Sequence, residues 1–448
     1  MSELPESWVP TTLGQVVSYA DNETTDPADM SPEAWLLELE DIERDTGKVL
    51  ERKTVGERVP KSSKNRFQAG DVLYGKLRPY LNKVVRADQD GFCSSEIIAI
   101  SPGLLDKNYL FYSMRSPSFI EYVSSVSHGM RMPRLGTQQA KSAPFVLPPQ
   151  AEQIRIAAKL DELLAQVDTL KARIDAIPAL LKRFRQSVLA AAVSGRLTEE
   201  WRARNSCPAW SEIKLEDMLA GTKDGICRGP FGSSIKKEFF VPAGHKVYEQ
   251  KNAIRDSSFI GEYFVDEGKY KELERFSVRP GDFIVSCAGT LGRISLLPVG
   301  APAGLINQAL IRIRTNKDLV LDEYFLVLFR SPVFQEKLIV GARGGAMQNL
   351  ASTKEIKALD IYCPAIPEQT EIVRRVEQLF AFADQLEAKV ASAKSRIDYL
   401  TQSILAKAFR GELVPQDPND EPASVLLERI QAQRAAAPKV RRGRKASV

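Results

Sequence analysis

Histidine and cysteine are scarce in this sequence, and their distribution excludes several kinds of site. The only two histidines, His128 and His245, lie in different halves of the 448 residues. A histidine-based catalytic triad or a histidine-rich metal site is therefore not expected. The five cysteines are odd in number, widely spaced and without a C-x-x-C pair. We expect no disulfide framework, no zinc site and a reducing compartment.

Long apolar runs are also missing. No stretch approaches the roughly 18 apolar residues that a membrane helix needs. The first eight residues, Met1–Trp8, have neither a positively charged start nor an apolar core of a signal peptide. We therefore expect a cytoplasmic protein that has no contact with a membrane.

The excess of positive charge is confined to one end of the chain. The net charge is +5, and five positive charges fall within residues 439–445. The remainder of the chain is formally neutral, so any affinity for nucleic acid must come from local patches or from partner subunits. We expect residues 413–448 to form a basic, disordered tail.

Motifs of catalysis are absent or incomplete. Residues 70–76 satisfy the G-x-x-x-x-G-K part of a phosphate-binding loop, but Leu77 follows where a hydroxyl would bind magnesium. The only adjacent prolines, Pro148 and Pro149, follow Leu147, so the Asn/Asp-Pro-Pro-Tyr motif of an amino-methyltransferase is missing. We expect no catalytic residues, no metal site and no cofactor bound by this chain.

The most informative feature is an internal repeat. Residues 109–119 match residues 324–334 at a shift of 215 positions. Glu152-Gln153 matches Glu368-Gln369, and residues 186–195 match 402–411, both at a shift of 216. Three blocks in one order at nearly constant spacing indicate a duplication.

Each half of the duplication has the same two parts. Residues 1–149 and 206–364 contain short β-branched or aromatic runs ended by turn residues, which predicts two α/β (α+β) globular domains. Residues 150–205 and 365–412 predict two long helices. Gly195 and Gly411, just past the apolar pattern, are suited to end them, whereas Pro178 should kink or split the first.

The two helices carry the apolar a/d seam of a coiled coil. In each, ten positions in four-three alternation are apolar over more than four heptads, from 156 to 188 and from 372 to 404. The seam residues include Ile156, Leu160, Leu163, Val167, Leu170, Ile174, Ile372, Val376, Leu379, Leu386, Val390 and Ile397.

Neither helix can bury its seam alone, so each should pack on the other. At about 1.5 Å per residue, the seam would make a rod of roughly 50 Å. Pseudo-two-fold symmetry would make the helices antiparallel, with one domain at each end. An ordinary stabilising helical hairpin is the alternative, but two compact domains need such a long rod only if their separation matters.

Recognition loops are the remaining candidates for function. Residues 76–83 interleave cations, an aromatic ring and an amide, and arginine and asparagine are suited to read guanine and adenine. Residues 128–134 add two guanidinium groups, and the second domain has similar loops. The candidate DNA-binding residues are Lys76, Arg78, Tyr80, Asn82, Lys83, Arg131, Arg134, Ser233, Ser234, Lys236, Lys237, Arg293, Arg343, Gln348 and Asn349.

Along its whole length the chain resembles the specificity subunit of type I restriction-modification enzymes. The resemblance is carried by Leu147–Gln153, Lys159–Asp168, Pro364–Gln369, Arg374–Phe380 and Thr401–Gly411. These helical segments look most like the enterobacterial K family (type IA). The resemblance is weak in the globular domains, so no DNA target can be carried over.

The resemblance implies a non-catalytic DNA-binding subunit. Each globular domain would read one half of a split, asymmetric double-stranded DNA target, and the helices would set the unread gap. Two modification subunits would dock on the helices and methylate adenine with S-adenosylmethionine, and restriction subunits would add an ATP- and Mg²⁺-dependent motor and nuclease. The residues leave open a coiled-coil scaffold whose end domains bind protein, and disfavour a fused enzyme with its own methyltransferase.

Overall fold

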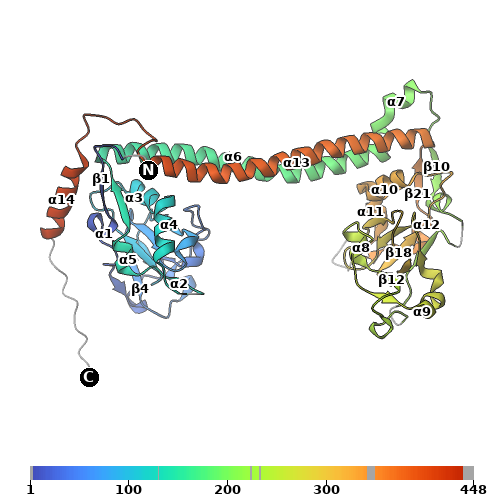
Figure 1. Ribbon diagram of the computed structural model, residues 1–448, viewed down its shortest axis with the longest axis horizontal. Helices are drawn as coiled ribbons and strands as arrows, with labels where there is room; N and C mark the ends of the chain where they lie inside the picture. The colour runs from blue at the N-terminus through green and yellow to red at the C-terminus, as the bar shows by residue number, and fades with distance from the viewer. Residues whose placement is uncertain (1–3, 130, 222–223, 232–233, 341–348, 437–448) are drawn as a thin grey trace. The chain divides into compact units, whose positions relative to one another are not determined.

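The structure is a computed structural model that describes residues 4–129, 131–221, 224–231, 234–340 and 349–436. The chain forms two units (Figure 1). Unit 1 contains residues 1–175 and 392–448, and unit 2 contains residues 176–391. Each unit therefore holds one globular domain together with parts of two long helices, which are α6 (Gln150–Val193) and α13 (Ile366–Ala408).

Two small sheets form the domain of unit 1. In one, β5 lies between β6 and β8 and is antiparallel to both. In the other, the order is β2-β4-β7-β3, and β3 runs parallel to β7. The strands are β1 (Val9–Thr12), β2 (Thr24–Thr25), β3 (Trp35–Leu37), β4 (Lys64–Phe67), β5 (Val72–Gly75), β6 (Val84–Arg86), β7 (Gly91–Cys93), β8 (Ile97–Ile100) and β9 (Pro144–Leu147); the helices are α1 (Leu13–Val16), α2 (Val55–Arg58), α3 (Lys107–Ser113), α4 (Pro117–Val126) and α5 (Thr137–Lys141).

The domain of unit 2 repeats this plan. Here β15 lies between β16 and β18, and β12 runs parallel to β17. The strands are β10 (Ser211–Lys214), β11 (Ile226–Arg228), β12 (His245–Tyr248), β13 (Phe264–Val265), β14 (Ser277–Val278), β15 (Phe283–Ser286), β16 (Ile294–Leu296), β17 (Gly304–Ile306), β18 (Leu310–Ile313), β19 (Ile339–Val340), β20 (Asn349–Leu350) and β21 (Asp360–Cys363); the helices are α8 (Gln250–Ile254), α9 (Glu267–Glu272), α10 (Asp322–Arg330), α11 (Pro332–Leu338) and α12 (Thr353–Lys357). The predicted fold class, duplicated α/β domains with two long helices, is confirmed.

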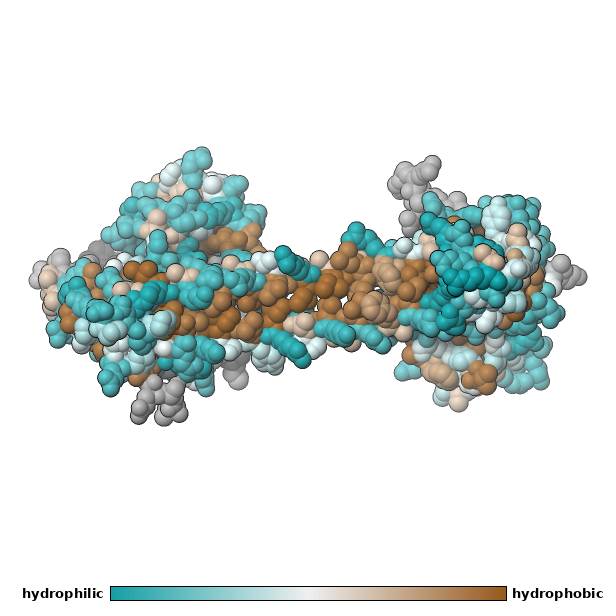
Figure 2. All heavy atoms as spheres, turned by 90° about the horizontal axis from the view of Figure 1, so that it is seen from above, coloured by the Kyte–Doolittle hydropathy of each residue, from teal (hydrophilic) through white to brown (hydrophobic). Residues whose placement is uncertain are grey.

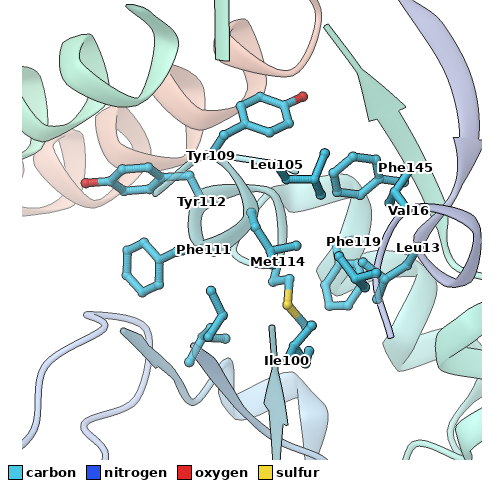
Figure 3. Packing of buried hydrophobic residues seen from close by; sticks show 14 of the residues in the cluster. Leu13, Val16, Ile100, Leu105, Tyr109, Phe111, Tyr112, Met114, Phe119 and Phe145 are labelled. Atoms are coloured by element: carbon cyan, nitrogen blue, oxygen red, sulfur yellow. The ribbon is translucent and has the colours of Figure 1, made fainter. Parts of the chain in front are cut away.

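Each core joins a domain to both long helices. In unit 1, aromatic residues of α3 and α4 meet α1 and β9 (Figure 3), and Ile156 and Ile404 belong to the same cluster. In unit 2 the corresponding cluster includes Val188 and Ile372. The start of one long helix therefore packs beside the end of the other within each unit, so the two helices run antiparallel there.

Ion pairs fix the register of the helices at the edges of the seam. In unit 1, Lys171 pairs with Asp398 at 3.2 Å and Lys394 pairs with Asp175 at 2.6 Å. In unit 2, Arg185 bonds to both Asp384 and Glu387. Pairs this exposed contribute little stability, but opposite charges at matching levels select one alignment over its neighbours.

Two seam expectations are wrong in detail. Leu170 is 46% exposed and Leu400 is 43% exposed, whereas the other seam positions are buried or half-buried. Both lie in the stretch of unit 1 where Lys171 of α6 pairs with Asp398 of α13. A two-helix coil leaves one side of some seam residues open to solvent unless a third element packs over them.

The helix ends follow the sequence, and of the two effects expected of the proline, a kink or a split, the split does not occur. Gly195 and Gly411 both adopt positive φ, 75° and 77°, directly after the helices. The helix α6 continues through Pro178, so the expected split is wrong. Residues up to 205 were expected in the same helix, but α6 ends at Val193 and is followed by a 3-10 turn and the short helix α7 (Glu199–Arg204).

The repeated Glu-Gln pair attaches each domain to its helix. The side chain of Gln153 accepts a hydrogen bond from the Asp106 backbone and donates one to the Pro148 carbonyl. Gln369 makes the same two bonds with Leu321 and Pro364. These bonds satisfy buried polar groups at the first turn of each long helix.

The glutamate of the pair holds the segment that follows the other helix. Buried Glu152 accepts hydrogen bonds from Trp8 at 2.8 Å and from Gln416 at 2.6 Å. Buried Glu368 accepts from Thr198 and from Arg202, both at 2.7 Å. The glutamate thus joins α6 to the N-terminal segment and to the segment after α13 in unit 1, and joins α13 to the segment after α6 in unit 2.

The prediction of a disordered C-terminal tail is wrong for residues 413–436. Residues Ala423–Ala436 form the helix α14, whose Leu426 and Ile430 are buried in the core of unit 1. Arg155 bonds to Asp420 ahead of this helix, and the Ala423 amide donates to the Ser7 carbonyl. A few apolar side chains were enough to order this polar segment because the first domain offers them a complementary surface. The basic residues 439–445 lie outside the described residues.

Candidate nucleic-acid interface

The two candidate loops of the first domain lie side by side. Residues 76–83 connect β5 to β6, and residues 128–134 follow α4. Leu77 and Arg134 form an isolated antiparallel bridge. The Arg78 amide donates to the Pro133 carbonyl at 2.7 Å, and the Leu135 amide donates to the Lys76 carbonyl at 2.9 Å. Two loops far apart in the sequence therefore make one surface.

This surface combines cations with exposed apolar side chains. Arg131 is exposed, as are Tyr80 and Met132. Arg134 is also exposed and pairs with Glu96 at 2.9 Å. A groove-facing loop needs such a mixture, because guanidinium groups can meet phosphates or base edges while apolar groups contact methyls and sugars.

Arg78 has an unusual backbone at the junction of the two loops. Its φ is +51°, and its Nε atom is buried without a partner. Non-glycine residues in this region cost on the order of 1 kcal/mol and gather at functional sites. The loop therefore imposes an unfavourable backbone conformation on Arg78.

Two residues of the first loop, Asn82 and Lys83, do not offer their side chains to DNA. Asn82 is only 3% exposed and adopts φ +45° at the end of the short turn Pro79–Leu81, so its amide does not face solvent. The Lys83 ammonium donates to the Leu39 carbonyl at 2.8 Å, and burial lowers its pKa. Both residues shape the loop instead of projecting from it.

In the second domain the candidate residues are placed less closely together. Arg293 is exposed in the loop between β15 and β16, the counterpart of the first candidate loop. Ser234 is half-buried, whereas Lys236 and Lys237 are exposed. Among the described residues, no hydrogen bond or ion pair joins 234–237 to the Arg293 loop. Ser233, Arg343 and Gln348 lie outside the described residues, and of Asn349 only the backbone is described, in β20.

The sequence analysis missed a cationic hollow in the second domain. A hollow of about 290 Å³ is lined by Lys251, Arg255, Ile260, Gly261, Glu262 and Tyr263. The Lys251 ammonium lies 5.4 Å from the Tyr263 ring centroid. Nearby, buried Lys246 donates to the carbonyls of Phe259 and Gly261, and its own burial lowers its pKa. The available signal was three cations within ten residues, Lys246, Lys251 and Arg255, with Tyr248 between the first two.

Exposed aromatic rings mark the same domain. Phe231 is 90% exposed directly before the candidate serines, and Phe259 is also exposed beside the hollow. The Gln250 side chain approaches Gly289, so α8 lies next to the Arg293 loop. The hollow and the Arg293 loop are therefore neighbours.

The described residues offer little for catalysis. They contain no group of three or more potential metal ligands among His, Cys, Asp and Glu. Burial raises the pKa of the Cys363 thiol to about 11, which disfavours the reactive thiolate. Within the described part of the chain, no helix has both the length and the apolar content to cross a membrane.

Known proteins resemble this chain over most of its length. A family model for the type I restriction modification DNA specificity domain matches residues 5–179 and 244–393. The EcoKI specificity subunit of Escherichia coli K12 is 37% identical over 77% of this chain and 75% of its own length. The EcoBI specificity subunit of Escherichia coli is 34% identical over 76% and 74%.

Solved structures share the fold. The HsdS subunit from Thermoanaerobacter tengcongensis has a TM-score of 0.60 at 21% identity, covering 92% of this chain and 98% of that one. The two matches of the family model fall on the two halves of the duplication. The chain therefore belongs to the type I restriction modification DNA specificity family, as a non-catalytic specificity subunit with two DNA recognition domains.

Proposed function

We propose that each domain reads one half of a bipartite DNA target and that α6 and α13 set the unread gap between the halves. The observation that carries this proposal is the joining of two cationic loops into one surface in the first domain. The equivalent β15–β16 loop carries Arg293 in the second domain. Two related recognition domains on one pair of helices are suited to bind an asymmetric DNA sequence that is interrupted by unread base pairs.

The residues divide into two proposed roles. In the first domain, Arg78 and Arg131 would meet base edges, because Arg78 lies where the two loops join and Arg131 is exposed. Lys76 and Arg134 would meet phosphates. In the second domain we assign base reading to Arg293 together with Arg343, Gln348 and Asn349. We assign contacts with the DNA phosphate backbone to the cationic hollow and to the remaining candidates, Ser233, Ser234, Lys236 and Lys237.

The partners are proposed from exposed apolar side chains on the long helices. Leu170, Leu180, Phe382 and Leu400 are exposed there, and Figure 2 shows apolar side chains gathered along the helices. We propose that two modification subunits cover them and that restriction subunits join that complex. S-adenosylmethionine, ATP and Mg²⁺ would then be bound by those subunits, and we expect the whole complex to act on DNA in the cytoplasm.

The test is to purify the full chain with its associated subunits from the native host and to map methylated adenines in that genome. We expect one interrupted motif whose two halves are separated by a fixed number of unread base pairs. A contiguous motif, or no methylation that depends on this chain, would contradict the proposal.

The competing function is a coiled-coil scaffold whose end domains bind protein. DNA binding by cationic loops should weaken steeply as salt rises, because each phosphate contact releases counterions. A largely apolar protein contact should show little such dependence. The salt slope of duplex binding by the complex therefore separates the two functions.

A further inference from the structure

Two acidic residues of α6 attach the first domain to the helix at points beyond the Glu-Gln motif. Asp161 accepts hydrogen bonds from the Tyr112 hydroxyl at 2.5 Å and from Arg86 at 3.4 Å. Two turns later, Asp168 pairs with Lys48 at 2.6 Å. The Tyr112 hydroxyl points away from the centre of the aromatic cluster (Figure 3). These contacts extend the attachment along α6.

Lys48 is carried by a tight hairpin, residues 42–49. Ile42 and Val49 form an antiparallel bridge, and the Glu43 amide donates to the Lys48 carbonyl at 2.9 Å. Gly47 has φ +75°, and a Cβ at this position would lie 2.5 Å from the Phe111 ring. The hairpin tip therefore presses on α3, and glycine is required there for both its conformation and its lack of a side chain.

A buried arginine also holds this hairpin. Arg115 is 5% exposed, donates to the Asp45 carbonyl at 2.7 Å, and lies 4.8 Å from the centroid of the Phe111 ring. We term this set of contacts the brace. It consists of Asp161 and Asp168, their partners Lys48, Tyr112 and Arg86, the hairpin 42–49 and Arg115.

The brace crosses a cleft. A space of about 820 Å³ separates the first domain from α6 and α13 in unit 1, and its lining includes Lys48, Arg86, Tyr112, Arg115 and Asp161. The domain and the helices are not in continuous contact here. Along this stretch of α6, beyond the shared apolar core, a small number of defined side-chain contacts attach the domain to the helix.

The second domain keeps the arginine but lacks the polar brace. Arg330, the repeat of Arg115, bonds to Asp256 at 2.8 Å. Tyr112 and Arg86 correspond to Val327 and Leu296, which cannot make these bonds. The repeats of Asp161 and Asp168 are Glu377, which is exposed, and Asp384, which bonds to Arg185 of α6. The brace is thus an addition to the first domain.

We propose that the brace is a positioning device that fixes the angle of the first recognition domain on α6 and thereby limits the gap lengths that the protein accepts. This proposal rests on the proposed function. Asp161 and Asp168 are positioning residues that contact no DNA in this scheme. Loosening them would let the first domain pivot, so that targets with a wrong gap would be bound with a smaller penalty.

The test uses the full chain in complex with its modification subunits. Asp161→Ala combined with Asp168→Ala removes both acceptors without entering the core, and Glu377→Ala is the matched control at the repeat position. The double substitution Asp161→Asn with Asp168→Asn retains an oxygen acceptor at each position. It should therefore largely restore the preference for the correct gap. The probes are duplexes that carry the mapped target with its gap unchanged, or altered by one base pair.

We expect the alanine pair to lower the preference for the correct gap by about 3- to 10-fold, because exposed ion pairs and single hydrogen bonds are each modest. Affinity for the correct target should change less than this preference. Amide exchange of residues 42–49 should accelerate in the alanine pair and stay unchanged in the Glu377→Ala control.

The outcomes separate the brace from the proposed function. Faster exchange with an unchanged gap preference would overturn the positioning role and leave a stabilising contact only. Unchanged exchange would overturn the brace itself. A wild-type complex that binds DNA without any gap preference would instead contradict the proposed function.

Discussion

Arg78 adopts a left-handed backbone conformation where the two candidate loops join, and non-glycine residues in that conformation are concentrated at functional sites. We predict that Arg78→Ala reduces discrimination at one position of one half-site by about 1–3 kcal/mol. Lys76→Ala is the control and should weaken binding evenly across sequences with a shallower salt slope. Competition binding with single-base variants measures both. An even loss for Arg78→Ala would reassign it to phosphate.

Glu371 gives the second domain a predictable response to acid. Hydrogen bonds from Arg374 and then Arg375 lower its pKa to about 2, and Arg375 also donates to the Leu197 carbonyl. Because the folded-state pKa is depressed, the stabilisation is present above the usual glutamate pKa and is lost as pH falls towards about 2. Glu371→Gln should therefore cost about 1–2 kcal/mol near pH 7 and progressively less below pH 4. Urea unfolding at several pH values checks this, and a difference independent of pH would contradict it.

At the scale of elements, the C-terminal segment should be part of the first domain. Leu426 is buried between α14 and the core of unit 1. We predict that Leu426→Ala destabilises unit 1 by about 2–4 kcal/mol. Truncation after Gly411 should destabilise it more, because it also removes Gln416 from Glu152 and Asp420 from Arg155.

Truncation after Ala436 is the matched control for this segment, because it removes only the basic residues beyond α14. It should leave thermal unfolding unchanged. Equal melting temperatures for all three chains would show that α14 does not stabilise the domain.

Periodic elements could be predicted from the sequence, whereas elements defined by long-range contacts could not. The seam of α6 and α13 repeats every three or four residues, so its extent follows from local spacing, and its antiparallel direction follows from the duplication. Ala423, Leu426, Leu427 and Ile430 of α14 fall at helical spacing, but a stripe of two turns does not stabilise a helix by itself, and the surface of the first domain explains why α14 forms. Asn82 was misassigned because its burial depends on a left-handed turn that sequence spacing does not reveal.

The same distinction applies to the candidate site. The loops 76–83 and 128–134 were each identified by composition, but their contact depends on the Leu77–Arg134 bridge. The Lys251 hollow was missed because its cations come from one short segment whose aromatic partner, Tyr263, is brought close by folding. The charge of each residue can be read from the sequence, whereas which charged residues lie together depends on the fold.

For the whole molecule, duplication implies that the two recognition domains are exchangeable modules. We predict that replacing residues 1–145 with another recognition domain changes one half of the DNA target only. The incoming domain must supply the equivalent of Trp8, because Glu152 on the retained helix is otherwise left buried with one donor fewer. Methylation mapping of the variant complex measures the outcome. A change in both halves would show that the domains do not read independently.

The length of the helices should determine the gap, and α13 offers a place to test this. Ala391 lies at the boundary between the two units, and the alignment set by the Asp175–Lys394 and Arg185–Asp384 pairs places it opposite Pro178 of α6. Four residues inserted after Ala391 would add about 6 Å to the helix, close to two base pairs at about 3.4 Å each. Four residues also make slightly more than one turn, so the apolar seam can largely persist through the insertion. Both half-sites should be unchanged and the unread gap should lengthen by about one base pair or more. Methylation mapping again provides the measurement, and an active variant with an unaltered gap would mean that something other than helix length spaces the domains.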